Sequence, residues 1–130
     1  MRLELQEKIF KEFDLMFSER HLSMMKTTMC WGLEVGDGWY DLIYDVCKKI
    51  QPLVSPEFRF TQVKEKYGRL EMYTYNASDE ISDIIDEASE KSLTVCEKCA
   101  EEGKLIESES HWFRVRCNKC WEELQTKLSV

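Results

Sequence analysis

The feature that most constrains this chain is a pair of Cys-x-x-Cys motifs in its last third. Cys96 and Cys99 form the first motif, and Cys117 and Cys120 form the second, after residues 100–116. Two residues between paired cysteines let both sulfurs of a tight turn face one point. Two such motifs therefore supply the four thiolates that tetrahedral Zn²⁺ prefers. The spacing predicts a zinc site formed by these four cysteines.

The residues between the motifs favour a zinc-ribbon or treble-clef-like unit. Gly103 is suited to a positive φ where the chain turns back, and residues 111–116 (His-Trp-Phe-Arg-Val-Arg) have strand character. Four thiolates leave no open position for substrate or water, so we expect the metal to be structural. The alternatives are a dithiol redox role and, in an exported protein, two disulfides.

The start of the chain bears on those alternatives. Residues 1–8 are rich in charge and contain no apolar core of a secretory signal, and no stretch approaches the roughly 18 apolar residues of a membrane span. We therefore expect a cytoplasmic protein with no membrane association. In that compartment thiols stay reduced and available to a metal.

Charge is distributed unevenly along the 130 residues. Residues 1–75 carry 11 basic and 12 acidic side chains (net −1), whereas residues 76–130 carry 7 and 13 (net −6), which together give the net charge of −7. Phosphate backbones are bound mainly by Lys and Arg, so this balance disfavours nucleic acid as a partner. The exception is a small surface of Trp112, Arg114 and Arg116, where a ring beside two cations could stack on a single-stranded base.

Periodicity indicates an α+β body over residues 1–93, with the zinc-ribbon-like unit over residues 94–130 packed on it. Apolar residues at helical spacing predict a first helix from about Leu5 to near Arg20. A second helix follows, capped by Asp37, and a third, capped by Ser78. Residues 58–66 and 69–75 flank Tyr67-Gly68 and predict a β-hairpin on which the amphipathic helices pack. A last helix is expected over residues 121–128.

The segment from Trp31 to Trp39 combines three glycines with two tryptophans, which indicates a shaped loop held by aromatic packing. Glu34 and Asp37 in this loop suit a capping and turn role. A binding loop formed by Trp31, Glu34, Asp37 and Trp39 is the alternative, and an enzyme would have to use Glu34 and Asp37 as its acid and base. No triplet typical of nucleases and no nucleophile with a paired base accompanies them.

Several strings together resemble a family of small, mostly uncharacterised proteins from phages and prophages. They are Trp-Gly-x-Glu-x-Gly-Asp-Gly-Trp at residues 31–39, Gln-Val-Lys-Glu-Lys-Tyr-Gly-x-Leu at 62–70, and the two cysteine motifs with a tryptophan between them. Tyr67 stands where that family commonly has phenylalanine, and Glu71-Met72 where it has Arg-Phe. The resemblance implies a phage or prophage accessory protein with a zinc ribbon and assigns no activity to any residue.

These observations lead to one hypothesis and two alternatives. We expect a non-enzymatic protein with a structural zinc ion that acts in the cytoplasm of a bacterial host by binding a host or phage protein, with inhibition of host defence as one such role. The alternatives are a small enzyme based on Glu34 and Asp37, and nucleic-acid binding through Trp112, Phe113, Arg114, Arg116 and Lys119.

Overall fold

The computed structural model describes residues 1–128 of the chain. The helices and strands alternate in a mixed order. They are α1 (Leu3–Glu12), 3-10 helices at Asp14–His21, Met29–Trp31 and Asp37–Trp39, β1 (Leu33–Glu34), α2 (Tyr40–Ile50), β2 (Arg59–Lys66), β3 (Arg69–Tyr75), α3 (Asp79–Ser92), β4 (Lys104–Glu107), β5 (Phe113–Arg116) and α4 (Asn118–Leu128).

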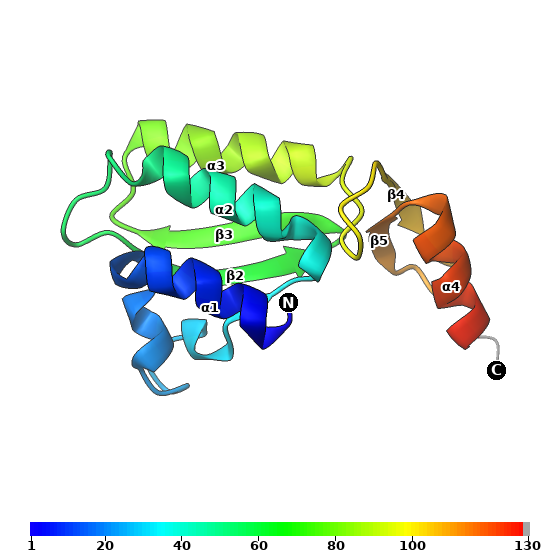
Figure 1. Cartoon of the computed structure of the whole chain (residues 1–130), viewed down its shortest axis with the longest axis horizontal. Coiled ribbons are helices and arrows are strands. Elements are labelled where there is room, and N and C mark those ends of the chain that lie inside the picture. Colours follow the sequence, from blue (N-terminus) through cyan, green and yellow to red (C-terminus); the bar gives the residue numbers. More distant parts are fainter. Residues whose placement is uncertain (129–130) are drawn as a thin grey trace.

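The body is a helical layer on a small sheet. Strands β1, β2 and β3 form the sheet in that order, and α1, α2 and α3 lie on one of its faces (Figure 1). The second sheet, β4 with β5, and helix α4 stand at one end of the long axis. This architecture confirms the predicted α+β class with a ribbon-like C-terminal unit. Among residues 1–128, no helix combines the length and the apolar character that a membrane span requires.

The hairpin expected around Tyr67-Gly68 is confirmed. Strands β2 and β3 are antiparallel, and the two turn residues have φ of 53° and 81°, the positive values that a two-residue hairpin turn requires. The sequence analysis missed β1, which pairs in parallel with the middle of β2. A strand of two residues carries no periodicity from which it could be found.

The first helix is shorter than predicted. It ends at Glu12 instead of near Arg20, and a 3-10 helix with a non-helical Phe17 follows. This break lets the ring of Phe17 stack on Phe60 of β2 at 4.8 Å between centroids. Arg20 then donates to the carbonyl of Phe17 at 3.0 Å, so a side chain satisfies a backbone group at the distorted turn.

The other helices agree with the sequence in their cores and differ at their ends. Ser78 caps α3 as predicted, its hydroxyl accepting from the N–H of Ile81 at 3.3 Å. Asp37 does not cap α2, because a short 3-10 helix intervenes before Tyr40. Helix α4 begins at Asn118, earlier than expected, and so contains the last cysteine. Residues 129–130 of the predicted C-terminal unit lie outside the described residues.

Candidate metal centre and the glycine loop

The structure brings together the sulfurs of Cys96, Cys99, Cys117 and Cys120, all within 4.8 Å of one another. Cys96 and Cys99 lie in the turn that follows α3, Cys117 follows β5, and Cys120 lies in the first turn of α4. Cys96 and Cys120 are buried, Cys117 is half-buried and Cys99 is exposed. Four thiol sulfurs around one point form a group that could hold a structural metal ion.

Backbone hydrogen bonds shape each cysteine turn. In the first, the N–H of Ala100 donates to the carbonyl of Cys96 at 3.0 Å, and Ala100 takes a φ of 73°. The positive φ expected at Gly103 is therefore at Ala100. Gly103 instead lies where a Cβ would crowd Cys96 N and the carbonyl of Arg116. In the second turn the N–H of Cys120 points at the sulfur of Cys117, 3.4 Å away.

The crowded thiols affect one another's protonation. Burial raises the pKa of Cys96, but backbone N–H groups, those of Cys117, Cys99 and Lys98, outweigh it and lower that pKa to about 7. Burial, followed by the neighbouring thiols, raises the pKa of Cys120 to about 12. Four clustered sulfurs thus resist becoming four anions together, and a divalent cation between them removes that repulsion.

The segment from Trp31 to Trp39, which we call the glycine loop, lies directly against the first cysteine turn. The N–H of Gly38 donates to the carbonyl of Glu97 at 2.7 Å, and the indole N–H of Trp39 donates to the carbonyl of Val95 at 2.9 Å. A Cβ at Gly38 would collide with backbone atoms of Cys96, Glu97 and Ala100. Glycine is required here because two backbones meet with no room for a side chain.

A buried ion pair completes this junction. The Glu97 carboxylate accepts from the N–H of Gly36 at 2.9 Å, and its other oxygen lies 3.5 Å from Nη1 of Arg116 on β5. That second oxygen is buried and has no hydrogen-bond partner among the described residues, so the guanidinium charge is its compensation. Removing either partner would leave a charge buried and unpaired, which is strongly destabilising.

The four residues predicted as a binding loop have different surroundings. Trp39 is fully buried at 0% exposure, and Trp31 is 62% exposed. Asp37 accepts from the N–H of Arg2 at 2.8 Å and so satisfies a donor at the start of α1. Glu34 is exposed on β1 beside Lys64. The loop supports the metal turn and α1, a role that the sequence did not indicate.

The predicted secondary surface lies on and beside β5. Trp112 is 62% exposed, and the guanidinium of Arg114 stacks on its ring at 5.1 Å while lying 3.8 Å from a Glu65 oxygen. Arg116, in the ion pair with Glu97, has a side chain only 13% exposed. Both arginines are thus engaged within the protein, which leaves little free positive charge there for a phosphate backbone.

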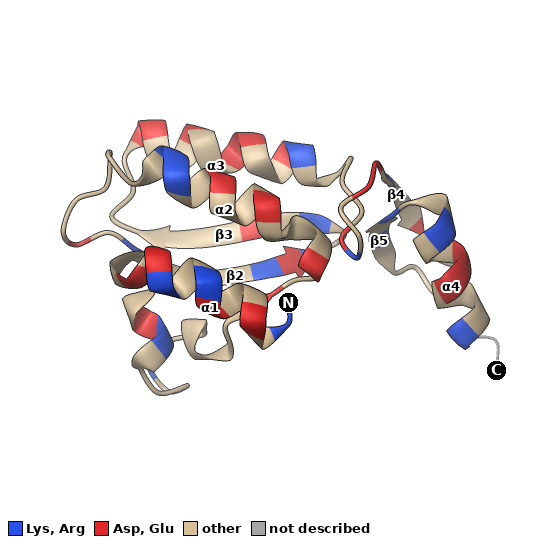
Figure 2. Cartoon of the chain, in the orientation of Figure 1, with Lys and Arg blue, Asp and Glu red and all other residues tan. Residues whose placement is uncertain are grey.

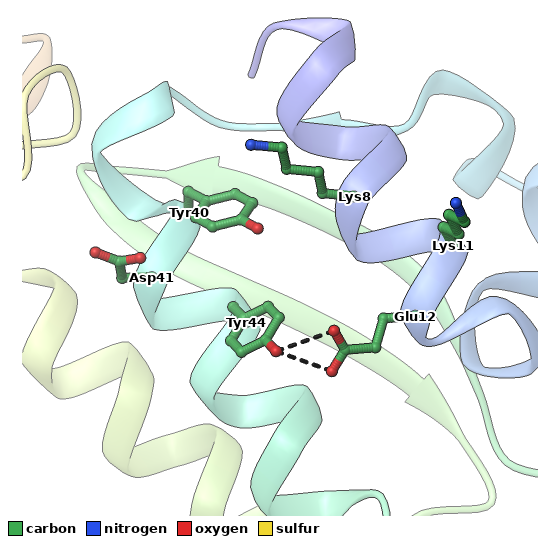
Figure 3. Close-up of a pocket in the computed structure, with 6 residues that line it drawn as sticks. All are labelled: Lys8, Lys11, Glu12, Tyr40, Asp41 and Tyr44. Carbon is green, nitrogen blue, oxygen red and sulfur yellow. Dashed lines mark hydrogen bonds between the residues drawn. The ribbon is translucent and has the colours of Figure 1, made fainter.

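A groove between α1 and α2 is a further feature that the sequence analysis missed (Figure 3). It has a volume of about 650 Å³ and is lined by Lys8, Lys11, Glu12, Tyr40, Asp41 and Tyr44. Glu12 joins the two helices, since it accepts from the Tyr44 hydroxyl and pairs with Lys48 at 3.0 Å. These contacts, Lys48 first, lower the pKa of Glu12. The lining charges are mixed and select no single ligand chemistry.

A comparison with protein-family models found no match, and comparisons with curated proteins and with solved structures found none either.

The contact of Gly38 with the first cysteine turn predicts that Gly38→Ala destabilises the protein. The added methyl meets backbone atoms that cannot rotate away, so we expect a loss of about 3 kcal/mol in the free energy of unfolding by urea. Glu34→Ala, in the same loop but exposed, is the control and should change it by less than about 0.5 kcal/mol. An equally small change for Gly38→Ala would show that the two backbones are not in contact.

The cysteine cluster predicts a metal requirement that mutation can localise. Purified protein should contain about one ion per chain by elemental analysis, and Cys120→Ser should remove most of it and lower the thermal midpoint of the whole protein. Cys30→Ser changes a half-buried cysteine outside the cluster and should leave the metal content unchanged. Folded wild-type protein without metal would contradict the assignment.

Proposed function

We propose that the metal is a structural zinc ion bound by all four cysteines. The support is the donor set, because four thiolates in a closed arrangement suit tetrahedral Zn²⁺ and leave no position for a reacting water. The ion then fixes the cysteine turns relative to β5 and α4, and it performs no chemistry. The elemental analysis described above should identify zinc. Iron at the same ratio would mean that the site has been assigned to the wrong metal.

We further propose that the protein is not an enzyme and acts by binding another protein through the exposed face of α3. This helix carries six acidic residues and one basic residue. Figure 2 shows the acidic residues along its length. Its apolar residues Ile81, Ile85 and Ala88 are buried toward the sheet, so the acids face away from the body. Of the six, only Glu90 has an ion-pair partner among the described residues.

An acidic helix face on which five of six carboxylates have no ion-pair partner among the described residues favours a particular kind of partner. Like charges along one helix repel one another, and a basic surface relieves that repulsion on contact. The basic groove of an enzyme that acts on nucleic acid is a surface of that kind, and an acidic helix would compete there with the natural substrate. Inhibition of such an enzyme by electrostatic competition is the mechanism that we favour.

The biological setting that we propose rests on the resemblance of residues 31–39 and 62–70 to phage and prophage proteins. In that setting the protein is an accessory gene product acting in the cytoplasm of a bacterial host. The partner is then a host or phage protein, and a host-defence enzyme with a basic groove fits both the setting and the charge of α3.

Reversing charge on α3 tests the protein-binding role. Asp83→Lys with Glu87→Lys should abolish recovery of a stoichiometric partner when tagged protein is incubated with lysate of a bacterial host at low salt. Both residues are exposed and one helical turn apart, so the change reverses the centre of the acidic face. Recovery by the wild-type protein should fall as salt rises, because the attraction is screened.

The matched control is Glu4→Lys with Glu7→Lys on α1, which alters the net charge by the same amount at two exposed positions. This variant should retain the partner. If both double variants lose it equally, only net charge matters and α3 is not the binding face. If the wild-type protein recovers no partner at any salt concentration, the binding role itself is wrong.

A further inference from the structure

The face of the sheet away from the helices is not covered. Core residues of β2 and β3, such as Val63 and Met72, point toward α1–α3, and the alternate residues point to the opposite side. None of these alternate side chains is buried. We call this surface the open sheet face, and its members on β2 and β3 are Arg59, Gln62, Lys64, Lys66, Arg69, Glu71, Tyr73 and Tyr75.

Two aromatic rings dominate this face. Tyr73 and Tyr75 are two residues apart on β3, so both rings stand on the same side of the sheet. They are 38% and 52% exposed, which is high for aromatic side chains on a strand. Sheets that bind single-stranded nucleic acid use aromatic rings in this arrangement, with one base stacked on each ring.

Each ring has a cation beside it. The guanidinium of Arg59 lies 4.3 Å from the ring centroid of Tyr75, and Nζ of Lys64 lies 5.9 Å from that of Tyr73. Arg59 is held in place by Glu19 at 2.6 Å, which fixes it against its ring. Arg69 is paired with Glu90 at 2.7 Å. Lys64 has no ion-pair partner among the described residues, and neither does Lys66, so both are available to phosphates.

The open sheet face is less acidic than the chain as a whole. The open sheet face carries four cations (Arg59, Lys64, Lys66 and Arg69), opposed on the face itself by Glu71 and, from β1, Glu34. Glu19 and Glu90 from neighbouring elements pair with two of these cations, Arg59 and Arg69, so the positive charge that has no ion-pair partner among the described residues is that of Lys64 and Lys66, in a protein whose net charge is −7. Of the acidic residues of α3, Glu90 pairs with Arg69 of this face, and the other five are exposed on the helix.

We propose that the open sheet face binds single-stranded nucleic acid, with consecutive bases stacked on Tyr73 and Tyr75 and the backbone held by Lys64 and Lys66. Duplexes are excluded because their bases are already stacked and cannot reach the rings. This function goes beyond protein binding by α3 and does not depend on it. The two surfaces are formed by different elements, α3 on one hand and β2 with β3 on the other, and they meet at the ion pair of Arg69 with Glu90.

Fluorescence anisotropy with labelled oligothymidine and oligouridine of about 12 nucleotides tests this proposal at low salt. Tyr73→Ala with Tyr75→Ala should weaken binding by at least about 10-fold, because each stacked base is lost. Tyr73→Phe with Tyr75→Phe should stay within about 2-fold of the wild-type protein, since the rings remain. Binding of either oligonucleotide supports the proposal.

Two controls separate this face from other surfaces. Tyr67→Ala removes an exposed aromatic ring in the hairpin turn and should leave binding unchanged. Asp83→Lys with Glu87→Lys should retain the oligonucleotide even where it loses the protein partner, so the two functions can fail separately. Unchanged urea midpoints for the tyrosine variants confirm that they fold.

Four results would overturn the proposal. One is the absence of binding by wild-type protein at low salt, and another is equal affinity for a duplex of the same length. A third is loss of binding in Trp112→Ala with Arg114→Ala but not in the tyrosine variants, which would place the site beside β5. The fourth is that the wild-type protein binds no oligonucleotide while Tyr73→Ala with Tyr75→Ala loses a protein partner. That result would make this face a protein-docking surface.

Discussion

The backbone of the glycine loop lies against the backbone of the first cysteine turn, with no side chain between them. Gly38 donates to the carbonyl of Glu97, and Gly36 donates to its carboxylate. The body therefore orders half of the metal site through contacts of its own. A metal site ordered in advance loses less conformational entropy when the ion binds, because its ligands already point to one place. The position of the whole C-terminal unit depends on this junction.

The features that the sequence predicted depend on residues close together in the chain. The cysteine spacing, the positive-φ turn that ends in Gly68 and the Ser78 cap each need only a few neighbouring residues, and each was found. What it could not predict depends on tertiary contacts. The break at Phe17 follows from its packing on β2, β1 exists only because β2 is beside it, and the need for glycine at position 38 comes from residues about 60 positions later.

Composition alone hides how this chain separates its charges. Acidic residues follow one another along α3 (Figure 2), whereas the open sheet face holds Lys64 and Lys66, which have no ion-pair partner among the described residues. The arginines near the second cysteine turn form ion pairs within the protein, Arg116 with Glu97 and Arg114 with Glu65. Net charge disfavours nucleic acid as a partner of the molecule as a whole, but affinity is decided by the local field at each surface.

The hydrogen bond from the Trp39 indole to the carbonyl of Val95 joins the largest fully buried side chain of the body to the segment just before the first metal ligand. Displacing that segment would leave an indole N–H buried in the hydrophobic core without an acceptor, which would destabilise the folded protein. The ribbon is consequently not a detachable appendage. Heating should produce a single calorimetric transition in which the body and the ribbon unfold together. Metal occupancy of the cysteine cluster then sets the temperature at which the sheet of the body unfolds.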